Sequence, residues 1–334
     1  MDWVLFGKFC SSFIAFAIPL ILVAYGGMFS EHSGVINIAL EAVMIIGAMV
    51  GALVCTSLDS LVDSGFPSQL AMLIAIFCAG LGGAVFSLLL SFASIKLKAD
   101  QVIAGTALNT IAPALFIIMI WAVQGEANTN IYLPSWRRIS LSMVGLTASS
   151  LPPFINSLLT FSLNYLTTIV ALFLIPIAAV VLYKTSFGLR LRACGEHPQA
   201  ADSVGINVYK MRYAGVTIGG FLAGIGGLSY VLVVSASFDG QVAGYGFLAL
   251  AVMIFGNWRP GRIILAALFF SLFTTISNMT SIIPWLPDFG SIAEGAKLYK
   301  LLPYVVTIIV LIFTSKRSQA PKAEGIPYDV SKRS

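Results

Sequence analysis

A single carboxylate, Glu41, stands inside the apolar stretch GVINIALEAVMIIGAMVGALV, residues 34–54. A stretch of this kind is about what a helix needs to cross a bilayer, roughly 20 residues. A charged side chain near the bilayer centre costs about 2.5–3.5 kcal/mol on insertion scales, so its presence there requires a compensating role. Two amides accompany it: Asn37 lies one turn earlier on the same helical face, and Asn109 lies in a second apolar run, 101–123.

Two interpretations fit these three polar side chains. In the first, the carboxylate and the amides pair with backbone groups or with each other, and so hold neighbouring helices together. In the second, they line a polar path along which a hydrophilic solute crosses the membrane. The residue types alone leave both interpretations open.

Catalytic chemistry has little support in the sequence. The two histidines, His32 and His197, are too few and too far apart for a convincing metal site, and the four cysteines show no paired spacing. The sequence has no G-x-x-x-x-G-K-[ST] loop to hold a nucleotide phosphate, and no intramembrane series of acids and histidines for a proton relay. We therefore expect neither ATP hydrolysis nor metal chemistry from this chain.

The elements that position these residues must be membrane helices. The 334 residues are 58% hydrophobic and 10% charged, with a mean hydropathy of +0.93, whereas an average soluble domain has about 25% charged residues. The apolar runs are long and continuous, unlike the alternating strands of a barrel. We predict an all-α polytopic integral membrane protein with about nine transmembrane helices (8–10). The runs are 7–29, 34–57, 69–94, 101–123, 163–183, 213–236, 243–257, 263–283 and 299–314.

Two breaks in this pattern indicate irregular paths. The seventh run, 243–257, is short, so a tilted, broken or re-entrant segment could form there. The break between the first two runs, Ser30 to Ser33, has only four residues and could lie at membrane depth inside the protein. Small residues recur at helical spacing, which favours close helix packing over the lining of a solute path. They are Gly47 and Gly51 in the second run, and Gly215, Gly219, Ala223 and Gly227 in the sixth.

The basic residues predict the orientation. When alternate loops are assigned to opposite sides, fourteen of the nineteen Lys and Arg residues fall on one side and five on the other. Because cytoplasmic loops carry the excess of Lys and Arg, the N-terminus is predicted to face out and the C-terminus in. The predicted regions are a transmembrane domain, 1–314, with an outer loop, 124–162, a cytoplasmic loop, 184–212, and a polar, poorly ordered tail, 315–334.

The cytoplasmic loop contains GLRLRACGEHPQAADSVGI, in which helix formers are separated by Gly195 and Gly205. Pro198 is expected at the first turn of a short helix, where a proline is tolerated. Such a helix could lie on anionic lipid through its arginines, or it could dock into a soluble partner. The loop by itself does not decide between these two roles.

Five segments spread along the chain resemble, in order, the permease subunits of bacterial ABC importers. They are GGMFSEHSGVINIALEAVMIIGA, KADQVIAGTALN, TSFGLRLRACGEHPQAADSVGINVYKMRYAGVTIGGFLAGIGG, AGYGFLALAVMIFGNWRP and LPYVVTIIVL. The chain is similar to the branched-chain-amino-acid/ribose-type permease family, in its nucleoside (simple-sugar-like) branch and to the shorter of two permeases. The resemblance implies a type II ABC importer-like bundle in the bacterial cytoplasmic (inner) membrane.

This resemblance also implies partners and roles. They are a second, longer permease in a heterodimer, a cytoplasmic ABC ATPase that binds ATP and Mg²⁺, and an extracytoplasmic substrate-binding lipoprotein; the chain itself would hold no cofactor. The loop 184–212 matches the family's ATPase-contacting region. The coupling residues would be Arg190, Arg192, Gly195, Glu196, Ala200, Ala201 and Gly205.

The sequence leaves the identity of the solute open. Where related permeases usually have an arginine after "AG", this chain has Tyr245, and Ala39 and Ala42 stand where glycine is common. A flat ring stacked on Tyr245 or Phe247 is compatible with this exchange. The candidate pathway residues are Asn37, Glu41, Asn109, Tyr245 and Phe247. A nucleoside is the first expectation, with riboflavin or a simple sugar as alternatives and a secondary carrier or channel as an alternative of another class.

Overall fold

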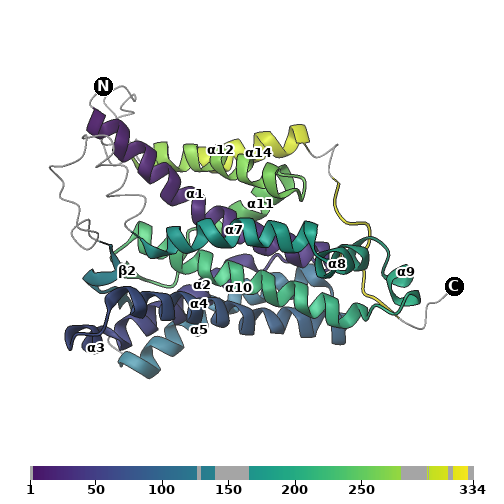
Figure 1. Cartoon of the computed structure of the whole chain (residues 1–334), viewed down its shortest axis with the longest axis horizontal. Helices are drawn as coiled ribbons and strands as arrows, with labels where there is room; N and C mark the ends of the chain where they lie inside the picture. Colours follow the sequence, from purple (N-terminus) through teal and green to yellow (C-terminus); the bar gives the residue numbers. More distant parts are fainter. Residues whose placement is uncertain are drawn as a thin grey trace.

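The computed structural model describes residues 3–125, 129–139, 165–279, 299, 301–314 and 319–329. Helices make up most of this part of the chain, and the long ones lie side by side in one bundle (Figure 1). They are α1 (Trp3–His32), α2 (Leu40–Ser57), α3 (Asp59–Asp63), α4 (Ser68–Ser91), α5 (Gln101–Gln124), α7 (Leu166–Lys184), α8 (Ser186–Glu196), α9 (Pro198–Ser203), α10 (Val208–Val234), α11 (Tyr245–Phe255), α12 (Pro260–Asn278) and α14 (Leu302–Thr314).

The bundle has two distinct ends. At one end, β1 (Ile131–Tyr132) and β2 (Ser237–Phe238) form a short antiparallel ribbon in which Ile131 pairs with Phe238. At the other end lie α8 and α9 (Figure 1). We call these the ribbon end and the α8 end. The first helix starts at the ribbon end, whereas residues 319–329 lie at the α8 end, so the two ends of the described chain lie on opposite sides of the bundle.

Among the described residues, seven helices are long and apolar enough to cross a membrane, and they match seven of the nine predicted runs. The other two runs form shorter helices within the described residues: α11 has 11 residues and α14 has 13. At 1.5 Å per residue, α11 spans only about half of a roughly 30 Å hydrocarbon core. A π-helical turn, Phe92–Lys96, extends α4, and a 3₁₀ turn, Ser135–Arg137, follows the ribbon strand β1. Most of the predicted outer loop 124–162 lies outside the described residues.

The helix α10 forms the centre of the bundle. Its most apolar stretch is 78% buried, whereas that of α5 is 28% buried, so α5 presents most of its surface to the surroundings. The glycines of α10 let the neighbouring backbones approach closely. A Cβ on Gly219 would lie 2.4 Å from the carbonyl oxygen of Gly26 in α1, and one on Gly227 would lie 2.2 Å from that of Met44 in α2. The predicted packing role of the small-residue row is thus confirmed.

The break between α1 and α2 is longer than predicted. The first helix continues to His32 and the second begins at Leu40, so the break covers residues 33–39 rather than Ser30 to Ser33. It folds back along α1, because Leu40 approaches Gly27, about one and a half turns before the end of that helix. The buried Ser30 stabilises this turn, because its hydroxyl donates a hydrogen bond to the carbonyl oxygen of Val35 at 2.9 Å.

Two other expectations about the α8 end were wrong. Gly195 does not end a helix; it lies within α8, and the break follows at His197. Pro198 does begin α9, and Gly205, at φ +83°, does follow its end. The tail was expected to be poorly ordered, yet residues 319–329 pack against the bundle, with Ala323 and Tyr328 buried. Its backbone finds partners on several elements, which a polar composition does not reveal.

Candidate functional site

Glu41 binds the start of the half-length helix α11. Its Oε1 accepts a hydrogen bond from the backbone N–H of Gly244 at 2.8 Å, and its Oε2 accepts one from that of Gly246 at 2.6 Å. No side chain from its own sequence neighbourhood caps this helix, whose N-cap residue is Gly244 in the left-handed region at φ +76°. Glu41 therefore caps α11 from the first turn of α2.

This contact is favourable for a physical reason. The first N–H groups of a helix have no partner within the helix, and the helix dipole places partial positive charge there. A carboxylate that accepts hydrogen bonds from two of these N–H groups offsets the free-energy cost of burying its own charge. It also offsets the cost of burying the two N–H groups. Discontinuous membrane helices commonly direct such N-termini at anionic groups, and here that group belongs to the protein itself.

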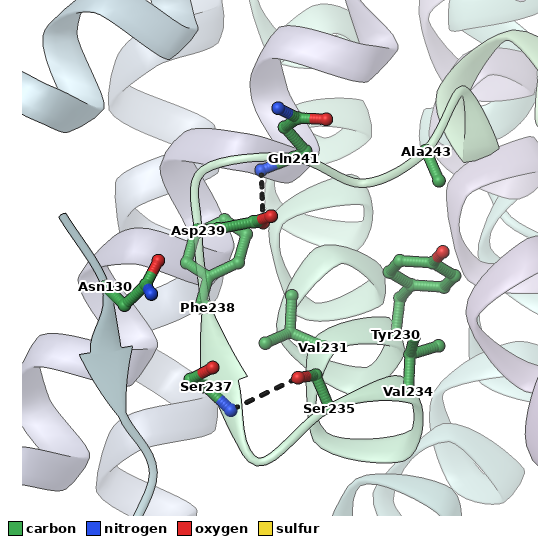
Figure 2. A pocket seen from close by; sticks show the side chains of 10 residues that line it. All are labelled: Asn130, Tyr230, Val231, Val234, Ser235, Ser237, Phe238, Asp239, Gln241 and Ala243. Atoms are coloured by element: carbon green, nitrogen blue, oxygen red, sulfur yellow. Dashed lines mark hydrogen bonds between the residues drawn. The ribbon is translucent and has the colours of Figure 1, made fainter.

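The segment that enters α11 forms one wall of a cavity at the ribbon end. Residues 235–244 connect α10 to α11; they are fixed by strand pairing at Ser237 and Phe238 and by Glu41 at Gly244. Figure 2 shows Asp239 and Gln241 of this segment around a cavity of about 390 Å³, above Tyr230 and Val234 of α10. Asp239 accepts from the backbone N–H of Gln241 at 3.2 Å, which shapes the turn.

A second cavity of about 250 Å³ shares Tyr230, Val234 and Ala243 with the first. Apart from Tyr245 of α11, its other polar groups come from α12 and α14. They are Thr274, Ser277, Asn278 and Tyr304. The hydroxyl of Tyr304 donates to the carbonyl oxygen of Ala243 at 2.6 Å, so α14 also holds the segment 235–244 in place.

Taken together, the lining of the two cavities is mixed: it is largely polar in the first cavity and largely apolar in the second. It offers hydroxyl, amide and backbone groups, with Asp239 as its one carboxylate, and none of the described lining residues is Lys or Arg. Such a surface suits a neutral solute that carries hydroxyl groups and a flat ring. A phosphorylated solute would meet Asp239 without a compensating cation.

The structure brings together only part of the predicted pathway. Tyr245 lines the second cavity, but its ring is buried against Tyr230, with centroids 4.3 Å apart, and its hydroxyl donates to the carbonyl oxygen of Phe16. Phe247 lies on an exposed face of α11 and lines neither cavity. Within the described part of the chain, the predicted stacking surface on these two residues is therefore not formed.

The two predicted amides differ. Asn109 joins α5 to the start of α2: its Oδ1 accepts from the N–H of Ala42, and its Nδ2 donates to the carbonyl oxygen of Ile38, both at 2.9 Å. Asn37 is fully buried in the break, and neither of its amide atoms has a hydrogen-bond partner among the described residues. Asn109 and Glu41 thus both bond to backbone groups of a neighbouring helix or turn.

The residues predicted for coupling divide into an outer and an inner set. The outer set is exposed at the α8 end; it comprises Arg190, Glu196, Ala200 and Gly205. Of the inner set, Arg192 lies 4.6 Å above the ring of Tyr183, while Gly195 and Ala201 are buried. A Cβ on Gly195 would lie 2.3 Å from the carbonyl oxygen of His32, so α8 rests directly on the end of α1.

Several cavity residues were missed by the sequence reasoning. Tyr230 and Tyr304 lie in apolar runs where an aromatic residue is unremarkable, and only the fold brings α10 and α14 to the same cavity. Asp239 and Gln241 did carry a signal, because they are polar residues in a short connection between two apolar runs. A connection that begins and ends at membrane helices and contains a carboxylate could have been selected on that basis.

Comparison with known proteins shows the family of the chain. Residues 9–311 match the family model described as the branched-chain amino acid transport system / permease component. The nucleoside ABC transporter permease protein NupC of Lactococcus lactis and the guanosine ABC transporter permease protein NupQ of Bacillus subtilis are each 38% identical to this chain, over 96% of this chain and of the relative. A further relative, the nucleoside ABC transporter permease protein NupB of L. lactis, is 24% identical over 92% of this chain and 83% of its own length.

No solved structure matched the chain. The family match covers about nine-tenths of the residues, and it includes the capped half-helix, both cavities and the two short helices of the α8 end. The chain is therefore a multi-pass membrane protein and belongs to the family of permease components of branched-chain amino acid transport systems.

Proposed function

We propose that this chain is a membrane-spanning subunit of an ATP-driven importer and that it carries nucleosides. It works with a second, longer permease, a cytoplasmic ATPase that binds ATP and Mg²⁺, and an extracytoplasmic binding lipoprotein. It lies in the bacterial cytoplasmic membrane with the α8 end in the cytoplasm, where the Lys and Arg excess of the loop 184–212 supports this orientation. The chain itself supplies a path and needs no cofactor.

The composition of the two cavities carries the choice of solute. A nucleoside presents ribose hydroxyls for Asp239 and the amide and hydroxyl groups, and a flat base for the exposed ring of Tyr304. It also lacks the phosphate that this lining would oppose. The nucleoside and guanosine permeases at 38% identity support the same choice.

The contacts described above provide a route from the α8 end to the cavities. A push on α8 reaches the end of α1 through Gly195 and His32. The end of α1 leads through the break 33–39 to Glu41, which holds Gly244 and Gly246 and thereby the cavity wall 235–244. In this mechanism, ATP binding in the partner moves α8, and Glu41 transmits that movement to the wall that faces the solute.

Uptake by a strain that lacks the chromosomal gene tests the proposal. Cells that carry the importer on a plasmid should accumulate labelled guanosine and adenosine, and unlabelled nucleosides should compete whereas nucleoside monophosphates should not. Accumulation of riboflavin or a simple sugar alone would contradict the nucleoside assignment. Uptake that persists when the ATPase gene is deleted would favour a secondary carrier or channel instead.

Asp239→Asn is expected to raise the KM for nucleoside uptake about tenfold, because a hydrogen bond to a charged group is worth roughly 1.4 kcal/mol more than one between neutral groups. Asparagine keeps the acceptor that shapes the turn at Gln241, so the wall should remain folded. The KM is measured from initial uptake rates. Asp63→Asn, an exposed carboxylate at the same end of the bundle, is the matched control. An unchanged KM for Asp239→Asn would remove this residue from the solute site.

Gly195→Ala is expected to abolish solute-stimulated ATPase activity in the purified importer. The added methyl group would lie 2.3 Å from the backbone oxygen of His32, so α8 must move away from α1 and the route to Glu41 is interrupted. Gly261→Ala adds the same methyl group in the first turn of α12, where a Cβ would have no neighbour within 4 Å, and serves as the control. Stimulation of the Gly195→Ala importer at the wild-type level would show that this contact does not transmit the movement.

A further inference from the structure

The last described stretch of the chain, residues 319–329, crosses the α8 end after α14 (Figure 1). We call it the C-terminal strap. Its Ala323 donates its backbone N–H to the carbonyl oxygen of Gly195 at 2.8 Å. Gly195 stands in the last turn of α8, where carbonyl groups have no partner within the helix. The strap therefore completes the end of α8.

The strap also fills the space between α8, α9 and α10. Tyr328 is 5% exposed and forms a hydrophobic cluster with Cys194 of α8, Ala201 of α9 and Val208 of α10. Its ring meets that of Tyr209 edge-on, with centroids 5.5 Å apart. Tyr328 is the largest member of this buried set, and each of the other three members comes from a different helix. Its removal would open the cluster that joins both short helices to α10.

Further contacts hold the strap along its length. Gln319 donates its N–H to Asn257 Oδ1 at 2.7 Å, and Arg212 donates to the carbonyl oxygen of Ile326 at 2.9 Å. At the far end, Lys98 and Asp329 form an ion pair at 2.7 Å. These partners lie after α11, in α10 and before α5, so the strap links the short helices to three separate parts of the bundle.

A pair of carboxyl groups, of which Glu31 is buried and Glu324 half-buried, adds a further anchor. Glu324 of the strap hydrogen-bonds to Glu31 near the end of α1, and Glu31 accepts from the indole N–H of Trp258 at 2.6 Å. Burial raises the pKa of the Glu324 carboxyl to about 7. The strap thus touches the same end of α1 on which α8 rests.

We propose that the C-terminal strap positions α8 and α9 for coupling, with Tyr328 as its main anchor. This proposal rests on the proposed function, because it assigns the strap to the same movement that links the ATPase to the cavities. The strap makes α8, α9 and the end of α1 move as one body. Without it, a push on α8 would be absorbed by loosening of the cluster around Cys194.

The native thiol of Cys194 reports the state of the strap without any assay of transport. It is fully buried under Tyr328, and burial raises its pKa to about 11, so it should react slowly with a polar maleimide. The purified importer is labelled as wild type, Tyr328→Phe, Tyr328→Ala and a chain that ends after Ser318. Versions with Cys194→Ser identify the part of the signal that belongs to this thiol, and solute-stimulated ATPase activity is measured on the same samples.

We expect Tyr328→Ala and the shortened chain to label Cys194 at least about tenfold faster than wild type, since an opened cluster exposes the thiol, and to lose solute stimulation. Tyr328→Phe keeps the ring and should retain both properties, as should Tyr132→Ala at the ribbon end. Slow labelling or wild-type stimulation in Tyr328→Ala and the shortened chain would overturn the proposal. If no nucleoside stimulates even the wild type, the proposed function fails, while the labelling rates still decide whether the strap covers Cys194.

Discussion

Glu41→Gln is expected to reduce nucleoside uptake to background while the protein remains in the membrane. The amide replaces one carboxylate oxygen with a donor, so either Gly244 or Gly246 loses its acceptor and two N–H groups face each other. Hydrogen bonds to a charged group are worth about 1.5–3 kcal/mol each, and a loss of about 3 kcal/mol lowers the population of the correctly held wall roughly a hundredfold. Uptake rates normalised to the amount of protein in the membrane measure this effect.

Two further variants separate this explanation from a general loss of stability. Glu41→Asp keeps the charge on a shorter side chain and should recover part of the uptake. Gly246→Ala disrupts the same contact from the side of α11, because the added Cβ would lie 2.4 Å from the backbone nitrogen of Glu41. This variant should therefore behave like Glu41→Gln. Normal uptake by Glu41→Gln would show that the capped α11 is not needed for transport.

Gly224→Val is expected to prevent stable folding of the bundle. A Cβ at Gly224 would lie 2.4 Å from the carbonyl oxygen of Ala79 and 3.1 Å from the Cα of Gly83, so α4 must move away from α10. From α2, a Cβ on Gly47 would lie 2.3 Å from the Cα of Gly224, so three backbones meet at this point. Helix association in lipid depends on this close packing. A backbone displacement of this kind typically lowers the free energy of unfolding by about 1–3 kcal/mol, and occasionally by more.

The amount of Gly224→Val in the membrane and its melting temperature in detergent test this expectation, and both should fall. Gly261→Val is the matched control, since Gly261 lies in the first turn of α12 and a Cβ there would have no neighbour within 4 Å. A Gly224→Val protein as abundant and as stable as this control would mean that the three helices can separate without penalty.

The membrane class and most of the helices follow directly from the sequence. Long apolar runs must form helices in lipid, because only a helix or a closed barrel satisfies its backbone there, and seven of the nine predicted runs are helices of spanning length. The small-residue row of α10 also predicted close helix packing by itself, since glycines at this spacing in a membrane helix mainly allow neighbouring backbones to approach. The start of α9 at Pro198 was likewise a local property of proline.

Contacts between distant segments decided the rest. The role of Glu41 depends on the N–H groups of Gly244 and Gly246, some two hundred residues later in the chain. No local sequence pattern predicts that α11 begins next to Glu41. The order of the strap depends in the same way on Gly195, Arg212 and Lys98, because a polar segment gains order only from the partners it meets. Hydrophobic periodicity records how a residue relates to lipid and core, whereas a hydrogen bond between distant segments exists only once the chain has folded.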